Sequence, residues 1–239
     1  MHTNRIILPL DVPSEAEAWK MCLAFRGEVG VMKVGLELFT RLGPQALAPP
    51  RSNGFGIMLD LKLHDIPNTV ERAVHSACSH KGIDFLTVHA AGGSEMMKRA
   101  VGAAQAATDP VTVLAITVLT SLAGEDFRRI FNQTPNDVEY VVQKLATIAY
   151  EAGARGFVCS PLEVKALRSL FSHDDGVTLV VPGIRPKGSS SDDQKRIATP
   201  TSAIQDGADY LVIGRPIRKA PDPIEAARTI AAEMKKAAH

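Results

Sequence analysis

The chain has 239 residues, of which 45% are hydrophobic and 22% are charged, and its formal net charge at pH 7 is +1. This length and composition suit one α/β domain with a full hydrophobic core, so residues 1–239 are expected to form a single domain. A nearly balanced charge excludes the strong basic excess of a typical nucleic-acid-binding protein.

Eight short apolar runs follow one another along the chain and predict β-strands. They are rich in Val, Ile and Leu and almost continuous in hydrophobicity, as strands buried on both faces are. In chain order, these runs are Ile6–Asp11, Val31–Gly35, Gly56–Leu63, Phe85–Ala90, Val111–Leu119, Gly156–Ser160, Thr178–Gly183 and Tyr210–Gly214.

Amphipathic segments between these runs predict helices. Ser14 is expected to cap a helix that continues to about Arg26, and Glu17 completes a capping-box pattern. Residues 68–80 and 137–151 carry apolar or small side chains at the helical period. The chain therefore alternates strands with helices.

Several prolines mark where elements begin or end. Pro161 and Pro223 each follow a good cap residue and predict the first turn of a helix. Pro49 and Pro50 are expected to end the second helix early. Pro9 falls inside the first predicted strand, where it removes a ladder hydrogen bond and suggests a bulge.

Alternating strands and helices leave two folds, a closed barrel and an open doubly wound sheet. No G-x-G-x-x-G motif follows the first strand, which removes the commonest argument for the open sheet. Polar residues fall at or just past the C-terminal ends of the predicted strands: Asp11, Lys33, Asp60, Lys62, His89, Thr120 and Arg215. A barrel gathers such positions into one mouth, so the sequence predicts a TIM (β/α)8 barrel with its active site there.

The densest group of charged residues lies on the third predicted strand. Asp60 and Lys62 share one face of this strand, because side chains at i and i+2 point the same way. Asp65 follows at the strand end, and Lys33 comes from the neighbouring strand. An alternating Lys-Asp-Lys-Asp array keeps its lysine protonated and suits a transition state that builds a carbanion beside an ammonium group. The alternative is a structural salt-bridge network in the polar layer of a barrel.

The last two strands carry the residues of a candidate phosphate site. Arg185 follows the seventh strand, and Gly214 and Arg215 follow the eighth. Barrels often bind phosphate with the loops after these two strands. Arginine holds phosphate through paired hydrogen bonds, and glycine permits close backbone approach. The alternative is that these are surface arginines on a loop.

Together these segments resemble orotidine 5′-phosphate decarboxylase of the bacterial type over essentially the whole chain. The segments that carry the resemblance are Leu10-Asp-Val12, Lys33-Val-Gly35, residues 60–69 (DLKLHDIPNT), Val118-Leu-Thr-Ser121, Pro182-Gly-Ile-Arg-Pro186 and Ile213-Gly-Arg-Pro216. The resemblance implies a homodimeric enzyme with shared active sites that converts orotidine 5′-phosphate to UMP and CO2. This reaction is the last step of de novo UMP biosynthesis, and the family uses no cofactor and no metal.

The resemblance also implies roles for individual residues. Lys62 would donate the proton to C6 of the pyrimidine, and Asp60 would lie beside the substrate carboxylate. Lys33 would pair with Asp60 and contact the ribose. Asp65 would reach across the dimer interface into the partner's site. The remaining substrate-binding positions are Asp11 at a ribose hydroxyl, Thr69 at the ribose or phosphate end, Thr120 at the pyrimidine edge, Arg185, Gln194, Gly214 and Arg215 at the phosphate end, and also Ile66 and Pro182.

Two positions depart from the family pattern. The family usually has a small residue where Pro9 stands, and a glycine in the loop before Gln194 where Asp192 stands.

Two other functions are compatible with parts of the pattern. The first is a sister decarboxylase or aldolase that acts on sugar phosphates with Mg²⁺, but such relatives carry a metal-binding glutamate where Lys33 stands, and a lysine repels a divalent cation. The second is a non-catalytic sensor of a phosphorylated ligand, which is expected to have lost Lys62 or Asp60. His64 and His89 near the mouth are also conceivable metal ligands, but the lysine charges argue against a metal there.

The sequence favours a cytoplasmic protein with no membrane partner. The cysteines, Cys22, Cys78 and Cys159, are few and widely spaced, which fits a reducing compartment rather than a disulfide framework. The longest apolar-rich run, residues 111–123, is too short to cross a bilayer.

Overall fold

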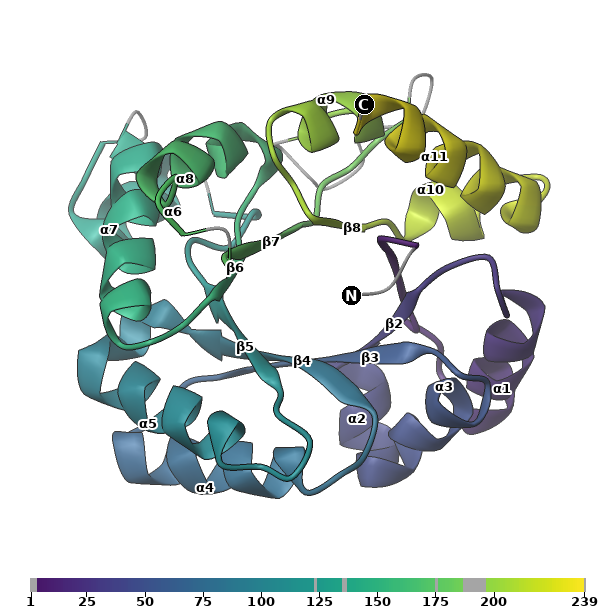
Figure 1. Cartoon of the computed structure of the whole chain (residues 1–239), viewed down its shortest axis with the longest axis horizontal. Helices are drawn as coiled ribbons and strands as arrows, with labels where there is room; N and C mark the ends of the chain where they lie inside the picture. Colours follow the sequence, from purple (N-terminus) through teal and green to yellow (C-terminus); the bar gives the residue numbers. More distant parts are fainter. Residues whose placement is uncertain (1–3, 123, 135–136, 175, 187–196, 239) are drawn as a thin grey trace.

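Eight parallel strands close into a barrel in which each strand pairs with the next in the chain and β8 pairs with β1 (Figure 1). The structure is a computed structural model, and it describes residues 4–122, 124–134, 137–174, 176–186 and 197–238. The strands are β1 (Ile6–Pro9), β2 (Val31–Gly35), β3 (Gly56–Leu63), β4 (Ile83–His89), β5 (Thr112–Ile116), β6 (Gly156–Val158), β7 (Thr178–Val181) and β8 (Tyr210–Val212).

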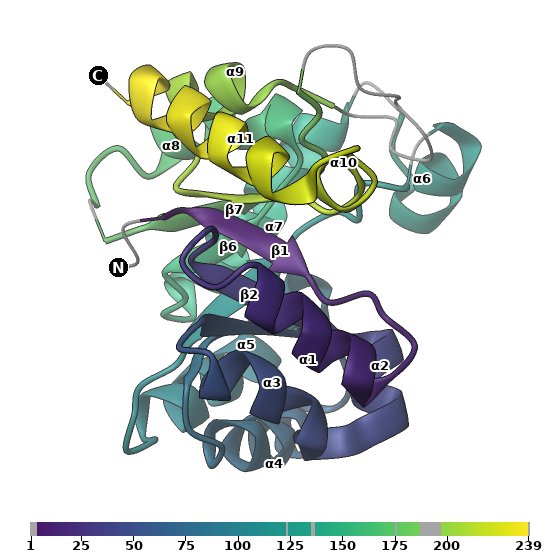
Figure 2. The same ribbon diagram turned by 90° about the vertical axis from the view of Figure 1, so that its right-hand side faces the viewer.

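Helices surround the barrel on its outside, as the two perpendicular views show (Figures 1 and 2). They are α1 (Glu15–Ala24), α2 (Leu36–Leu42), α3 (Ala48–Ser52), α4 (Pro67–Cys78), α5 (Gly93–Gln105), α6 (Gly124–Phe131), α7 (Val138–Glu151), α8 (Val164–Leu170), α9 (Pro200–Gln205), α10 (Arg215–Arg218) and α11 (Pro223–Ala237), with 3₁₀ turns η1 (Gly43–Leu47), η2 (Ala90–Gly92) and η4 (Pro161–Glu163). None of the helices in the described part of the chain is long and apolar enough to span a membrane.

The core has two layers, because successive side chains of a strand point to opposite faces of the sheet. In β1, Ile7 faces the barrel interior, whereas Ile6 and Leu8 pack against the helices outside. The interior layer consists of Ile7, Val31, Met58, Phe85, Leu114, Val180 and Tyr210. Burial on both faces explains the nearly continuous hydrophobicity of the strands, and the predicted barrel fold is confirmed.

The predicted helix starts at cap residues are also confirmed. Ser14 accepts a hydrogen bond from the Glu17 N–H and caps α1. Ser160 caps the 3₁₀ turn that leads into α8, and Asp222 caps α11. The first helix ends at Ala24, slightly before the predicted end, and most strands end earlier than predicted.

Two expectations about prolines were wrong. The register of β1 on β2 runs without a shift through Pro9, so Pro9 marks no bulge. Leu10 N–H donates to the Lys33 carbonyl, so the nitrogen of Pro9 faces the other way, towards the end of β8, and the β1–β2 ladder loses no bond. Pro49 and Pro50 do not end a helix but begin α3, where a missing N–H has no helical partner to lose. Helix α2 ends instead at Leu42 and is capped by Gly43, whose φ is +55°.

Gly156 on β6 lies too close to β5 to carry a side chain, and this predicts a loss of stability on substitution. A Cβ on Gly156 would lie 2.6 Å from Leu114 Cδ2 and 2.8 Å from the Val113 carbonyl oxygen, so the backbone would have to shift. Gly156→Ala is expected to destabilise the protein by about 1–3 kcal/mol, as overpacking of a core does. Denaturant unfolding would measure this loss.

The matched control is Gly102→Ala in the middle of α5, where an added Cβ meets nothing within 4 Å. This exchange is expected to stabilise the protein by up to about 1 kcal/mol, because it reduces the freedom of the unfolded chain. Equal effects of the two substitutions would contradict the steric account.

Candidate active site

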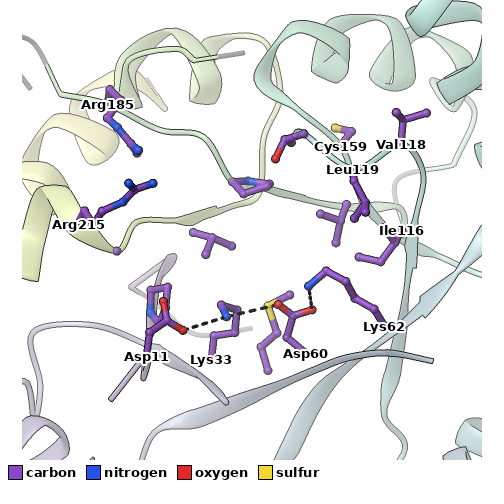
Figure 3. A pocket seen from close by; sticks show the side chains of 17 residues that line it. Asp11, Lys33, Asp60, Lys62, Ile116, Val118, Leu119, Cys159, Arg185 and Arg215 are labelled. Carbon is purple, nitrogen blue, oxygen red and sulfur yellow. Dashed lines mark hydrogen bonds and ion pairs between the residues drawn. The ribbon is translucent and has the colours of Figure 1, made fainter. Parts of the chain in front are cut away.

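A cavity of about 250 Å³ opens where the strands end (Figure 3). Most of its lining residues come from the C-terminal parts of several strands and from the segments that follow them. Charged residues line part of it and apolar residues another part: Pro9, Asp11, Lys33, Met58, Asp60, Lys62, Ile116, Val118, Leu119, Thr120, Val158, Cys159, Pro182, Arg185, Val212, Gly214 and Arg215.

Four charged side chains of alternating sign form a row along one wall (Figure 3). Lys62 Nζ donates to Asp60 Oδ1 at 2.7 Å. The other carboxylate oxygen of Asp60 lies 3.4 Å from Lys33 Nζ, which in turn lies 3.6 Å from Asp11 Oδ1. Each ammonium group therefore has a carboxylate next to it, and Asp60 lies between the two lysines.

Asp60 is the most buried member of this row, with 7% of its surface exposed. Burial acts to raise the pKa of its carboxyl, but the charges of Lys33 and Lys62 and hydrogen bonds from Lys62 and Thr87 outweigh burial. The pKa of Asp60 is therefore lowered from its ordinary value, and the carboxylate stays ionised at neutral pH.

The chain leaves room for the Lys33 ammonium by having no side chain at Gly35. A Cβ at Gly35 would lie 3.0 Å from Lys33 Nζ and 3.8 Å from Asp11 Oδ1. Asp11 is held from another direction, because Arg218 donates to its carbonyl at 2.7 Å and lies 3.8 Å from its carboxylate. Arg218 therefore holds Asp11, whereas Lys33 is held by the carboxylates of Asp11 and Asp60 in the space that Gly35 leaves open.

Two arginines point into the cavity from the side opposite Lys62 (Figure 3). Arg185 is buried, and its backbone N–H donates to the Ala198 carbonyl at 2.8 Å. Arg215 begins α10 directly after Gly214, where an added Cβ would lie 3.4 Å from Pro9 Cγ. The pair of guanidinium groups gives this end of the cavity the charge and the donors that a phosphate needs.

An apolar wall lines another part of the same cavity. Ile116, Val118 and Leu119 come from the end of β5 and the residues after it, and Val158 and Cys159 come from β6 and its end. The cavity therefore has a charged wall, an apolar wall and a cationic end.

Three predicted site residues do not line this cavity. Asp65 is exposed and accepts a hydrogen bond from the Ile66 N–H at 2.6 Å. Ile66 is 64% exposed, and Thr69 is also exposed. Gln194, like the departure at Asp192, lies outside the described residues.

The two histidines near the mouth lie together, with ring centroids 5.3 Å apart. The pKa of His89 is lowered, chiefly by burial and further by the nearby His64 and Lys62. Within the described ranges, no group of three His, Cys, Asp or Glu side chains is arranged to hold a metal ion.

Sequence reasoning missed three features of this site. Thr87 on β4 is fully buried and hydrogen-bonded to both Asp60 and Lys62. Arg218 holds Asp11 from a position 207 residues away in the chain. Lys62 has a φ of +50°, which L-amino acids rarely adopt. Only Thr87 carried a signal in the sequence, as a hydroxyl within an apolar strand.

Comparisons with known proteins agree on one family. The orotidine 5′-phosphate decarboxylase / HUMPS family matches residues 4–230. This chain belongs to that family.

Individual relatives match over nearly their whole length. A protein named orotidine 5′-phosphate decarboxylase from Anaeromyxobacter sp. (strain K) is 50% identical over 97% of this chain and 99% of its own. One of the same name from Opitutus terrae is 46% identical over 96% and 98%. The crystal structure of orotidine 5′-phosphate decarboxylase from Lactobacillus acidophilus has a TM-score of 0.82 and 37% identity, and the match covers 97% of this chain and 99% of that one.

The lowered pKa of Asp60 predicts how stability depends on pH. A depressed carboxyl pKa stabilises the fold above the pKa of the unfolded chain, about 4, and this contribution is lost as pH falls through the lower folded pKa. Asp60→Asn is therefore expected to be less stable than the wild type at pH 7, and the difference should shrink as pH falls below about 4.

Unfolding curves of both proteins over a pH series would measure this difference, with substitution of the exposed Asp109 by Asn as the control. A difference between wild type and Asp60→Asn that stays constant down to acid pH would contradict the assignment.

Proposed function

We propose that this enzyme decarboxylates orotidine 5′-phosphate to UMP and CO2 without a cofactor, as the last step of de novo UMP biosynthesis. The observation that carries the proposal is the Lys62 ammonium, held at 2.7 Å by the buried Asp60 in a cavity whose far end carries Arg185 and Arg215. An ammonium group that can donate a proton and two guanidinium groups that can hold a phosphate thus line one cavity of about 250 Å³.

The proposed reaction breaks the bond between C6 and the substrate carboxyl carbon. The electron pair of this bond stays on C6 while CO2 leaves, and the Lys62 ammonium beside it stabilises the developing negative charge. A proton from Lys62 then forms the new C6–H bond, and solvent restores the proton of Lys62. Asp60 keeps Lys62 protonated and directed at C6 until that step.

The rest of the cavity orients the substrate. The phosphate would lie against Arg185, Gly214 and Arg215, with Gln194 at the same end, and the ribose against Asp11 and Lys33. Thr120 and Pro182 would contact the base. Ile66 and Thr69 do not line this cavity and would therefore contact substrate only in the site of a partner, as proposed below for Asp65. Binding energy from the phosphate end helps the reaction only if it fixes the base beside Lys62, because the phosphate itself does not react.

We further propose that the enzyme is a homodimer in the cytoplasm and that Asp65 completes the site of the partner. Asp65 and Ile66 lie on the exposed segment after β3 and do not reach the cavity of their own chain. Exposed carboxylate and apolar side chains at the rim of the mouth suit an interface between two copies. Cys22, Cys78 and Cys159 are all buried. Cysteines that are so few and so widely spaced in the chain fit a reducing compartment.

The first test is turnover by the purified enzyme with a chelator present, followed by the ultraviolet change as orotidine 5′-phosphate becomes UMP. Lys62→Ala is expected to lower turnover by more than about 10⁴-fold, because it removes both the proton donor and the positive charge, while UMP binding is retained. Lys98→Ala on the exposed face of α5 is the matched control.

Near-normal turnover by Lys62→Ala would refute the assigned role. If the activity of the wild type disappears when the chelator is added, the alternative of an Mg²⁺-dependent enzyme that acts on sugar phosphates is favoured. Tight binding of the nucleotide without any turnover would favour the sensor.

The second test mixes two inactive chains, Lys62→Ala and Asp65→Ala. If Asp65 acts in the partner's site, one site of each heterodimer contains neither substitution, and activity should return to about half of the wild-type value per heterodimer. Native mass spectrometry would verify the exchange of subunits.

The control mixes Lys62→Ala with the double variant Lys62→Ala/Asp65→Ala, in which no intact site can form. If the mixture of Lys62→Ala with Asp65→Ala stays inactive although the subunits have exchanged, Asp65 acts within its own chain or not at all.

A further inference from the structure

The pairing of β3 with β4 is interrupted where β3 carries Asp60 and Lys62. Leu59 is opposite Leu86, and Leu63 is opposite Val88, so the stretch of β3 between them is longer than the stretch of β4 that it faces. The extra residues cannot all join the ladder, and Lys62 takes the left-handed φ of +50° in this bulge. Such a conformation in a lysine persists only where the surroundings fix it.

Thr87 is the residue of β4 that lies opposite this bulge, between Leu86 and Val88. It is completely buried. Its hydroxyl oxygen accepts a hydrogen bond from the Lys62 N–H at 2.8 Å. The same hydroxyl donates to Asp60 Oδ1 at 3.0 Å, the oxygen that also receives the Lys62 ammonium at 2.7 Å.

These contacts form a closed ring from the Lys62 backbone through the Thr87 hydroxyl and the Asp60 carboxylate to the Lys62 ammonium. We propose that Thr87 is a positioning residue, whose hydroxyl holds the Lys62 backbone in its left-handed conformation and directs the Asp60 carboxylate at the Lys62 ammonium. The inference rests on the proposed function, since it concerns the proton donor of that reaction. Thr87 does not line the cavity and acts only through Asp60 and Lys62.

The role depends on a hydroxyl rather than on side-chain volume. Thr87→Val keeps the shape but leaves the Lys62 N–H without its acceptor and Asp60 Oδ1 without one donor. Lys62 is then free to leave the strained conformation, and its ammonium moves relative to the substrate. Misplacement of a catalytic group by about 1 Å costs about 10²-fold in rate.

The experiment compares kcat and KM for orotidine 5′-phosphate in the wild type, Thr87→Val, Thr87→Ser and Thr117→Val. Thr117 is a matched control, because it is also a buried threonine, and its hydroxyl donates to the Val158 carbonyl at 3.0 Å. We expect Thr87→Val to lower kcat by about 10²-fold with little change in KM. Thr87→Ser, which keeps the hydroxyl, and Thr117→Val should both stay close to the wild type.

A second readout follows Asp60 itself by carbon NMR of its carboxyl group. A hydrogen bond to a carboxylate lowers its pKa, so loss of the Thr87 hydroxyl should raise the Asp60 pKa, and Thr87→Ser should restore it. If Thr87→Val does not fold, Thr87→Cys replaces it, because a thiol is a much weaker donor and acceptor and differs from serine by one atom.

Unchanged kcat in Thr87→Val, or an equal loss in Thr87→Ser, would overturn the inference. An equal loss of kcat in Thr117→Val would also overturn it, because the effect would then be general to buried threonines. Failure of the proposed function is distinguishable, since the wild type would not turn over orotidine 5′-phosphate, whereas the Asp60 titration would still report whether Thr87 acts on the array.

Discussion

The buried carboxylate of Asp60 is the interaction on which the rest of the site depends. A carboxylate with 7% exposure is costly to keep ionised, and two lysines and a threonine hydroxyl offset that cost. The same contacts fix where the two ammonium groups lie, since Lys33 and Lys62 approach different oxygens of Asp60. Because Asp11 adds a second negative charge, the row is neutral overall while each charge stays fixed in place.

The barrel brings this row and a cationic end together in one cavity. β2 and β3 supply Lys33, Asp60 and Lys62, whereas Arg185 and Arg215 follow β7 and β8. Closure of the barrel between β8 and β1 places these ends around one mouth. Lys33, Asp60 and Lys62 lie within strands, so their spacing is set by the barrel rather than by a loop. This suits a site that must hold charge in place before the substrate arrives.

Much of this arrangement is predictable from the sequence, because the signals are local. Parallel strands that are buried on both faces appear in the sequence as apolar runs. The spacing of two residues between Asp60 and Lys62 predicts that both side chains lie on one face of their strand. The remainder depends on contacts that no local pattern contains. Thr87 acquires its contacts only because β3 bulges opposite it, and Arg218 meets Asp11 only after the barrel closes. Pro49 and Pro50 were misinterpreted because proline ends one helix and begins another equally well.

The most direct test of the account is a crystal structure of the protein with UMP bound. The account predicts the phosphate against Arg185 and Arg215, and C6 of the base within about 3.5 Å of Lys62 Nζ, with Asp60 still bonded to that ammonium. A nucleotide bound with its base at the arginine end, or with C6 beyond the reach of Lys62, would contradict it.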